Sequence, residues 1–226
     1  MDLKKEAART AITFIKDKAI IGLGAGSTIH HLVDFLAEEI DKGLNVQLVT
    51  SSFTTQQLLL QKGLVVQPAS SFDTIDIYFD GCDQLDKDLH ALKCGGGIHT
   101  REKILASMAT QFILVGDETK YAEALETKFP LAIEVLPESF RYVIKCMEKI
   151  FPSVKIAVRK SDKNDGPCIT ADGNYLLDAK FEAWPRLEQI NPTIKAITGV
   201  VETSLFYNLA HTAIIATKEK IKILDK

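Results

Sequence analysis

The feature of this chain that most constrains its fold is a regular alternation of short apolar runs with longer amphipathic segments, which continues to about residue 130. The apolar runs have the length of buried strands, and we expect strands at 19–21, 46–49, 65–66, 75–79 and 112–115. The segments between them place apolar residues at helical spacing, and we expect helices at 3–18, 29–40, 54–61 and 101–110. This alternation predicts an α/β fold with a Rossmann-like, open, mainly parallel sheet and helices on both faces.

The pattern changes after Pro130. Strands are expected at 131–135, 154–158 and 175–177, and helices at 138–150 and from about Glu182 onward. A mixture of this kind predicts a smaller α+β domain. We therefore predict a Rossmann-like domain formed by residues 1–130 and 204–226, and a small α+β domain formed by residues 131–203.

Charge and composition argue against several classes of protein. The formal net charge is -3 at pH 7 and the basic residues are scattered, so we expect no nucleic-acid partner and no anionic membrane partner. No apolar stretch is long enough to span a bilayer, and the start of the chain lacks the apolar core of a signal peptide. The four cysteines form no CxxC pair, which leaves a structural zinc site without support. We expect a cytoplasmic protein with free thiols.

A glycine-rich segment, GLGAGST at 22–28, connects the first expected strand to the second expected helix. Gly24 and Gly26 allow the backbone to approach a ligand closely, and Ser27 and Thr28 add hydroxyl groups where the helix begins. Unpaired N–H groups at a helix start favour an anion. The segment matches neither the Walker loop nor the dinucleotide-binding spacing. A tight strand-to-helix turn without a ligand explains it equally well.

Two aspartates, Asp80 and Asp83, directly follow the strand expected at 75–79. Both can face the cleft that parallel strands form at their carboxyl ends. One carboxylate can accept a proton from a hydroxyl group while the other orients a neighbouring group. An acidic turn is the simpler explanation for these residues in isolation. A magnesium site is also conceivable, but no nearby residues complete an oxygen shell.

A third segment, KCGGGIHTREK at 93–103, contains three consecutive glycines before a helix. Such a run costs backbone entropy and is most useful where the backbone passes close to a ligand. Lys93 enters the loop and Glu102 follows it, so the pair is suited to supply an electrophile and a base in one cleft. In isolation, a surface lysine and a first-turn helix acid are the simpler interpretation.

Six motifs occur in one order along the chain. They are GLGAGST at 22–28, TSSFTT at 50–55, DGCDQ at 80–84, KCGGGIHTREK at 93–103, Lys120 after VGDET, and GVVETSLF at 199–206. In this order they resemble the type A ribose-5-phosphate isomerases. The resemblance extends from residue 1 to about 216 and is strongest from Asp80 to Lys103.

This resemblance implies an aldose-ketose isomerase that interconverts D-ribose 5-phosphate and D-ribulose 5-phosphate through an enediolate, in the non-oxidative pentose phosphate pathway, with no metal and no other cofactor. It implies that Glu102 is the base, that Lys93 stabilises the enediolate oxygen, and that Asp80 helps to open the furanose ring. Asp80 and Asp83 would bind sugar hydroxyls. The remaining implied substrate-binding residues are Lys4, Gly24, Gly26, Ser27, Thr28, Gly95, Gly96, Gly97 and Lys120. Family enzymes are usually dimers or tetramers, which implies a homodimer or a homotetramer here.

Several positions depart from the family pattern. They are Ala25 for threonine, Cys82 for alanine, Gln84 for glutamate, Cys94 for glycine, His99 for an apolar residue and Ser204 for glycine. The expected base, lysine and aspartates all remain, so the departures bear on the exact sugar phosphate more than on the reaction. Two alternatives remain open, an isomerase of a different sugar phosphate and a non-catalytic sugar-phosphate sensor. We expect His99 to be a loop residue without a substrate contact.

Overall fold

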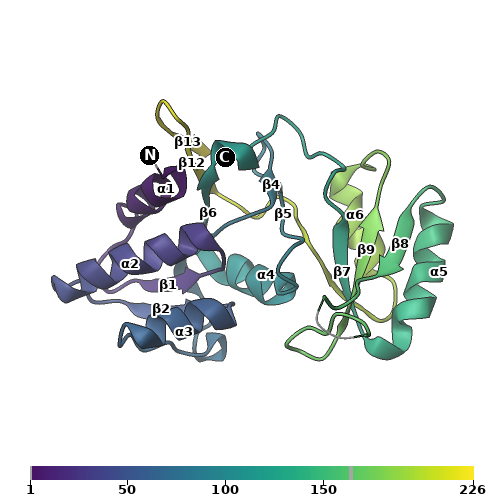
Figure 1. Cartoon of the computed structure of the whole chain (residues 1–226), viewed down its shortest axis with the longest axis horizontal. Coiled ribbons are helices and arrows are strands. Elements are labelled where there is room, and N and C mark those ends of the chain that lie inside the picture. Colours follow the sequence, from purple (N-terminus) through teal and green to yellow (C-terminus); the bar gives the residue numbers. More distant parts are fainter. Residues whose placement is uncertain (1, 163–164) are drawn as a thin grey trace.

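The computed structural model describes residues 2–162 and 165–226, which form a large and a small sheet with helices around each (Figure 1). Within the described residues, the large sheet has the strand order β13-β12-β6-β3-β1-β2. All of its neighbouring pairs are parallel except β12 and β13, which are antiparallel. Its strands are β1 (Ile20–Leu23), β2 (Gln47–Thr50), β3 (Ile75–Asp80), β6 (Ala109–Asp117), β12 (Thr212–Ala216) and β13 (Ile221–Asp225).

Four helices accompany the large sheet. They are α1 (Leu3–Ile12), α2 (Ser27–Asp41), α3 (Phe53–Gln61) and α4 (His99–Met108). The Asp2 carboxylate caps α1 by accepting hydrogen bonds from two backbone N–H groups, and the Ser52 hydroxyl caps α3 by accepting one, from the Thr55 N–H group. α1 ends at Ile12, six residues earlier than expected, because the next backbone bonds close tighter turns, from Phe14 to Ala11 and from Ile15 to Ile12.

The large sheet is buried on both faces. Along β6, Ile113 and Val115 pack with α1 and α2 on one face, whereas Phe112 and Leu114 pack with α4 on the other. Successive side chains of a strand point to opposite faces, so both sets must be apolar in a sheet covered on both sides. The predicted Rossmann-like sheet, mainly parallel and with helices on both faces, is therefore confirmed.

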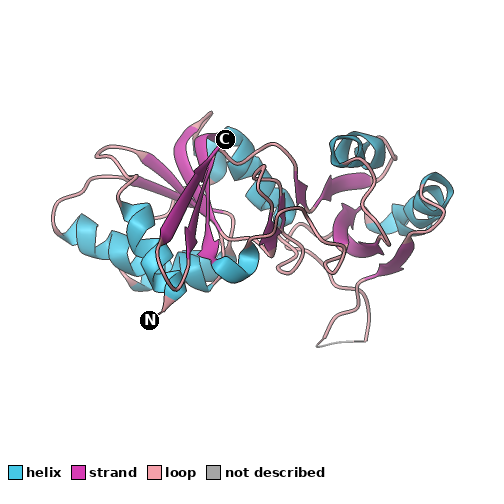
Figure 2. Ribbon diagram, turned by 90° about the horizontal axis from the view of Figure 1, so that it is seen from above, coloured by secondary structure: helices cyan, strands magenta, loops and turns pink. Residues whose placement is uncertain are grey.

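The smaller sheet is antiparallel, with the strand order β10-β7-β9-β8, and is covered by two helices (Figure 2). Its strands are β7 (Leu131–Val135), β8 (Lys155–Val158), β9 (Tyr175–Lys180) and β10 (Val200–Thr203), and its helices are α5 (Phe140–Ile150) and α6 (Leu187–Lys195). A third sheet joins the short strands β4 (Gln84–Leu85), β5 (Ala91–Leu92) and β11 (Leu205–Phe206). The 3-10 helices are η1 (Ala69–Ser71), η2 (Glu118–Lys120) and η3 (Pro137–Ser139).

Two local expectations are wrong, and some short elements were not predicted. We call the four-stranded sheet β10-β7-β9-β8, together with α5, α6 and the loops that connect them, the small unit. Its last helix begins at Leu187 rather than near Glu182, because Pro185 disfavours helical geometry at Trp184. The strand expected at 65–66 is a single bridge between Val66 and Leu48. The short third sheet and β13 were not expected, since two-residue strands are too short for a periodic signal and the apolar residues of β13, Ile221, Ile223 and Leu224, do not alternate strictly.

The small sheet has an apolar core of its own, formed with α5 and α6. This core also includes Leu92, Cys94, Leu125 and Leu205, which lie outside residues 131–203. The domain boundaries at 130/131 and 203/204 stay a prediction. Among the described residues, no helix combines the length and the apolar character that a membrane crossing requires.

Candidate active site

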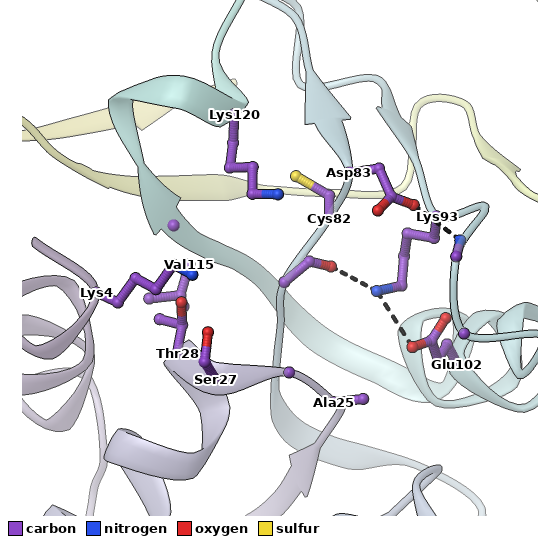
Figure 3. Close-up of a pocket in the computed structure, with 15 residues that line it drawn as sticks. Lys4, Ala25, Ser27, Thr28, Cys82, Asp83, Lys93, Glu102, Val115 and Lys120 are labelled. Carbon is purple, nitrogen blue, oxygen red and sulfur yellow. Dashed lines mark hydrogen bonds and ion pairs between the residues drawn. The ribbon is translucent and has the colours of Figure 1, made fainter. Parts of the chain in front are cut away.

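A cavity of about 280 Å³ opens at the carboxyl edge of the large sheet. Its walls come from the segments that follow β1, β3, β5 and β6, together with the starts of α1, α2 and α4 (Figure 3). The carboxyl edge is where open α/β sheets bind ligands. The lining residues are Lys4, Ala25, Gly26, Ser27, Thr28, Gly81, Cys82, Asp83, Lys93, Gly95, Gly96, Glu102, Val115, Gly116 and Lys120.

The glycine-rich segment lies directly against Asp80. A Cβ atom on Gly24 would lie 2.0 Å from the Asp80 carboxyl carbon, so only glycine fits there. Gly26 has φ +97°, a conformation that glycine adopts without strain, and it precedes Ser27 at the start of α2. The backbone of this segment therefore lies against Asp80 on one side and forms part of the cavity wall on the other.

The Asp80 carboxylate is fully buried and accepts four hydrogen bonds or ion-pair contacts. Oδ1 accepts from the backbone N–H groups of Ala25 (3.1 Å) and Gly81 (2.8 Å). Oδ2 accepts from the Tyr78 hydroxyl (2.5 Å) and lies 2.9 Å from Lys93 Nζ. Each oxygen of this buried carboxylate thus has two donors, which is the condition under which a buried charge is tolerated.

Lys93 connects Asp80 to Glu102. The short strand β5 and the loop after it carry Lys93 to the cavity wall, where Nζ donates to the Gly81 carbonyl oxygen (2.5 Å). The same Nζ lies 3.3 Å from Glu102 Oε1, on the first turn of α4 (Figure 3). Lys93 and Glu102 are 7% and 5% exposed. Both therefore reach the cavity from well-packed positions. Lys93 is not the surface lysine of the simpler interpretation, and Glu102 is a first-turn helix acid, as that interpretation has it, but a buried one.

Burial and the neighbouring charges shift the pKa values of this pair. Burial, reinforced by the nearby negative charge of Asp80, raises the pKa of Glu102 to about 8, although Lys93 acts in the opposite direction. Burial alone would lower the pKa of Lys93, but the attraction of Asp80 and Glu102 outweighs it and raises that pKa above its ordinary value. Near neutral pH, the site thus combines a fixed cation with a carboxyl group that can exchange a proton.

Asp83 holds the glycine loop at the cavity. Its Oδ2 accepts hydrogen bonds from the backbone N–H groups of Cys94 (2.5 Å) and Gly95 (3.0 Å). The carbonyl oxygen of Gly95 accepts from Arg159 Nη1 of the small unit (3.4 Å). The loop is thereby fixed from both sides, and its backbone can approach a ligand without a side chain between them.

The far end of the cavity is basic and rich in hydroxyl groups. Lys4 from α1 and Lys120 from η2 extend into it from two sides, and Ser27 and Thr28 lie between Lys4 and Ala25 in Figure 3. The N–H groups at the start of α2 add positive potential there. This combination is suited to bind a phosphate group.

The first turn of α4 is fastened to the small unit by the neighbours of Glu102. The Thr100 hydroxyl donates to the Glu134 carboxylate, and Arg101 forms a bidentate pair with Asp172, with contacts of 2.6–3.2 Å. His99 is not the loop residue that we expected. It is the first residue of α4, fully buried, with Nε2 3.3 Å from the Glu202 carbonyl oxygen.

The structure brings most of the sequence-predicted residues to this one cavity, but three do not line it. Gly24 and Asp80 lie behind the wall, and Gly97, with φ +66°, packs against Leu176 of the small unit. The sequence analysis assigned no role to several lining residues, namely Gly81, Cys82, Val115 and Gly116. They could have been found from position alone, because each lies within the last three residues of a parallel strand or within two residues after one.

Comparisons with known proteins find relatives that match most of the chain. The family model for ribose 5-phosphate isomerase A (phosphoriboisomerase A) matches residues 47–220. The chain is 39% identical to ribose-5-phosphate isomerase A of Methanothermobacter thermautotrophicus, over 99% of this chain and 98% of that protein. It is 36% identical to the human ribose-5-phosphate isomerase, over 92% of this chain and 68% of that protein.

Solved structures show the same relationship. The ribose 5-phosphate isomerase A of Methanocaldococcus jannaschii superposes with a TM-score of 0.92 and is 32% identical, with 100% of this chain and 99% of that chain covered. A D-ribose-5-phosphate isomerase in complex with phospho-erythronic acid superposes with a TM-score of 0.93 and is 33% identical, with 100% and 98% covered. The family match over most of the length and the relatives above 30% identity lead to one conclusion: this chain belongs to the ribose 5-phosphate isomerase A family.

Proposed function

We propose that this chain interconverts D-ribose 5-phosphate and D-ribulose 5-phosphate, and that the cavity at the carboxyl edge of the large sheet is where it does so. One observation carries the proposal: a buried carboxyl group, Glu102, lies 3.3 Å from a buried ammonium group, Lys93, on the wall of a cavity that has Lys4 and Lys120 at its other end. A sugar phosphate fits this polarity, with its reacting carbons at the first pair and its phosphate at the second.

Glu102 is the proposed base. In the open-chain aldose, its carboxylate removes the proton from C2, and the electron pair forms the C1–C2 double bond of an enediolate while the C1 carbonyl oxygen takes the negative charge. Glu102 then delivers a proton to C1, either the abstracted proton or one that has exchanged with solvent, and with transfer of the hydroxyl proton from O2 to O1 this gives the ketose. A pKa of about 8 suits this exchange, because the group accepts and releases a proton near neutral pH.

Lys93 is the proposed stabiliser of the enediolate oxygen. Its ammonium group lies beside Glu102 and stays charged, so it can donate to the oxygen on which negative charge develops. The contact with the Gly81 carbonyl and the contact with Asp80 fix the direction of Nζ before substrate binds. A donor that is already oriented needs no reorganisation during the reaction.

The two aspartates differ in position, and this difference revises their proposed roles. The sequence assigns both to sugar hydroxyls and assigns ring opening to Asp80. In the structure Asp80 is fully buried behind the cavity wall and contacts the lining residues Lys93, Ala25 and Gly81, whereas Asp83 itself lines the cavity. We therefore assign the hydroxyl contact to Asp83 and assign to Asp80 the holding of Lys93.

The phosphate is proposed to bind between Lys4 and Lys120, with hydrogen bonds from Ser27, Thr28 and the backbone of the glycine-rich segment. Gly24 shapes that segment, and Gly26 gives it the turn into α2. Gly95 and Gly96 would line the reacting carbons, while Gly97 holds the loop against the small unit. Because a relative binds phospho-erythronic acid, we expect that compound to compete with the substrate here.

Proton NMR of the purified protein with ribose 5-phosphate in deuterated water, with EDTA present, tests the proposal. We expect ribulose 5-phosphate to form and deuterium to enter the reacting carbon. Glu102→Gln should abolish turnover while phospho-erythronic acid still binds. Glu148→Gln, at an exposed position on α5, is the matched control and should behave as the unaltered protein. Binding without conversion would indicate a sensor, and conversion only of another aldose phosphate would indicate a different substrate.

We also propose that the chain assembles as a homodimer or homotetramer and acts in the cytoplasm, in the non-oxidative pentose phosphate pathway. Family membership supports the assembly and the pathway, and the four free thiols fit a reducing compartment. Light scattering coupled to size-exclusion chromatography tests the assembly, and a mass equal to one chain would contradict it.

A further inference from the structure

Tyr78 is a buried titratable residue next to the proposed active site that the mechanism above does not use. It lies two residues before Asp80 on β3, so both side chains emerge on the same face of the strand. The ring has no exposed surface and packs against Phe112, with the ring centroids 5.2 Å apart. Its hydroxyl group donates to Asp80 Oδ2 at 2.5 Å, the length of a charge-assisted hydrogen bond.

The hydrogen bonds at this hydroxyl have a fixed direction. Tyr78 has one proton to donate, and Asp80 receives it, so the contact with Ser51 Oγ (3.3 Å) requires Ser51 to act as the donor. A chain of hydrogen bonds and ion pairs thus runs from Ser51 through Tyr78 and Asp80 to Lys93. Lys93 in turn contacts Glu102, the proposed base.

Asp80 Oδ2 is shared between Tyr78 and Lys93, and the two donors compete for the same oxygen. We propose that Tyr78 is a positioning residue for the isomerase reaction: by occupying Oδ2, it limits how strongly Asp80 holds Lys93 and so keeps the Lys93 ammonium available to Glu102 and to the enediolate. This inference rests on the proposed function. Tyr78 itself does not line the cavity and does not touch the substrate.

The charges that face Glu102 decide in which direction its pKa moves when the Tyr78 hydroxyl is removed. These are the Lys93 cation and the Asp80 and Asp83 carboxylates. Burial, together with Asp80 and Glu102, raises the pKa of Tyr78 well above its ordinary value, so Tyr78 remains a donor at every working pH. Without the phenol hydroxyl, Asp80 has more unscreened negative charge and draws Lys93 toward itself. Glu102 then lies in a more negative potential and farther from the Lys93 cation. Its carboxyl group therefore holds its proton more tightly, and the pKa of Glu102 rises.

The test compares Tyr78→Phe with Tyr207→Phe as a matched control. Tyr207 stacks on His90, and its hydroxyl takes no part in the chain that leads to Lys93. For Tyr78→Phe we expect kcat to fall about tenfold, the rising limb of the pH profile of kcat to move about one unit to higher pH, and KM to change little. Tyr207→Phe should keep the unaltered profile. Ser51→Ala removes the hydrogen bond to Tyr78 and should move the limb in the same direction by less.

Distinct outcomes separate this inference from the function on which it rests. If the unaltered protein does not convert ribose 5-phosphate, the proposed function fails, and this inference fails with it. If the unaltered protein is active and Tyr78→Phe melts normally but keeps the position of the rising limb, only the role of Tyr78 is refuted. A shift of equal size in Tyr207→Phe would refute it as well. If Tyr78→Phe does not fold, the test rests on Ser51→Ala. A rising limb of the kcat profile that stays at its original pH in that variant would overturn the proposal.

Discussion

Replacement of Lys103 by methionine should destabilise the fold strongly, because Lys103 is the buried connection between α4 and the strand β10. Its Nζ lies 2.9 Å from Glu202 Oε1 and donates to the carbonyl oxygens of Thr203 (2.6 Å) and Leu205 (2.9 Å). Both charged side chains are about one-tenth exposed. Methionine has a similar length but offers no donor to any of these oxygens.

The size of the stability loss depends on the contacts that Glu202 and the Leu205 carbonyl keep once Lys103 is replaced. Breaking a buried ion pair by removing one partner costs about 3–5 kcal/mol, because the other charge stays buried without compensation. Here Lys195 still contacts the other oxygen of Glu202, and Asn191 still donates to the Leu205 carbonyl at 3.0 Å. We therefore expect a loss near the lower limit, about 3 kcal/mol. Burial lowers the pKa of Lys103 to about 8, so the lysine is charged at pH 7, where the measurement is made.

The matched control is Lys195→Met, which removes the other cation from the same carboxylate. Lys195 is 46% exposed, and an ion pair open to solvent contributes about 0–1 kcal/mol. Urea denaturation followed by circular dichroism gives both free energies of unfolding. Fluorescence of Trp184, the single tryptophan, reports the small unit, since Trp184 packs against its core beside Phe181. A loss below about 1 kcal/mol for Lys103→Met, or equal losses for both variants, would refute the reasoning.

Three further predictions concern the site itself. The value of kcat/KM should rise with pH through about 8, because Glu102 acts as a base only after it loses its proton, and a profile that is flat from pH 6 to 9 would contradict the assigned base. Gly24→Ala should abolish turnover, because the new Cβ would lie 2.0 Å from the Asp80 carboxyl carbon. The control is Gly43→Ala, at a position with open space around it and φ +109°. It should cost only about 1 kcal/mol of stability and leave turnover intact. Lys120→Gln should raise KM for ribose 5-phosphate about tenfold or more with little change in kcat, because a charge-assisted contact to phosphate is lost, and an unchanged KM would remove Lys120 from the phosphate site.

The parts of this protein that the sequence predicts well depend on local patterns. Apolar runs of strand length located β1, β3 and β7 to within one or two residues, and the order of polar segments after the strands located most of one cavity. Both follow from short-range rules, since side chains alternate along a strand and parallel strands end at a common edge. The glycines of the 22–28 segment indicated either a close backbone approach or a tight turn, and in the structure Gly24 approaches the Asp80 side chain.

The parts that the sequence does not predict depend on contacts between distant segments. Nothing near Asp80 in the sequence indicates that Ala25 and Lys93 would supply donors to its carboxylate, so its burial behind the cavity wall could not be foreseen. His99 looked like a loop residue because three glycines precede it, yet α4 begins with it and buries it. A buried polar residue in a glycine-rich context has no periodic signal of its own.

The first turn of α4 shows why the fold and the proposed chemistry depend on the same residues. Thr100, Arg101 and Lys103 each bind a carboxylate of the small unit, whereas Glu102 between them extends into the cavity. The orientation of the proposed base is therefore set by the docking of a helix against a second sheet, through partners that are 34 to 99 positions away in the chain. A proton transfer between adjacent carbons tolerates only small displacements of the base. If Glu102 is the base, the small unit thus has a part in the reaction without contributing a residue to the cavity wall, because it holds the helix that carries Glu102.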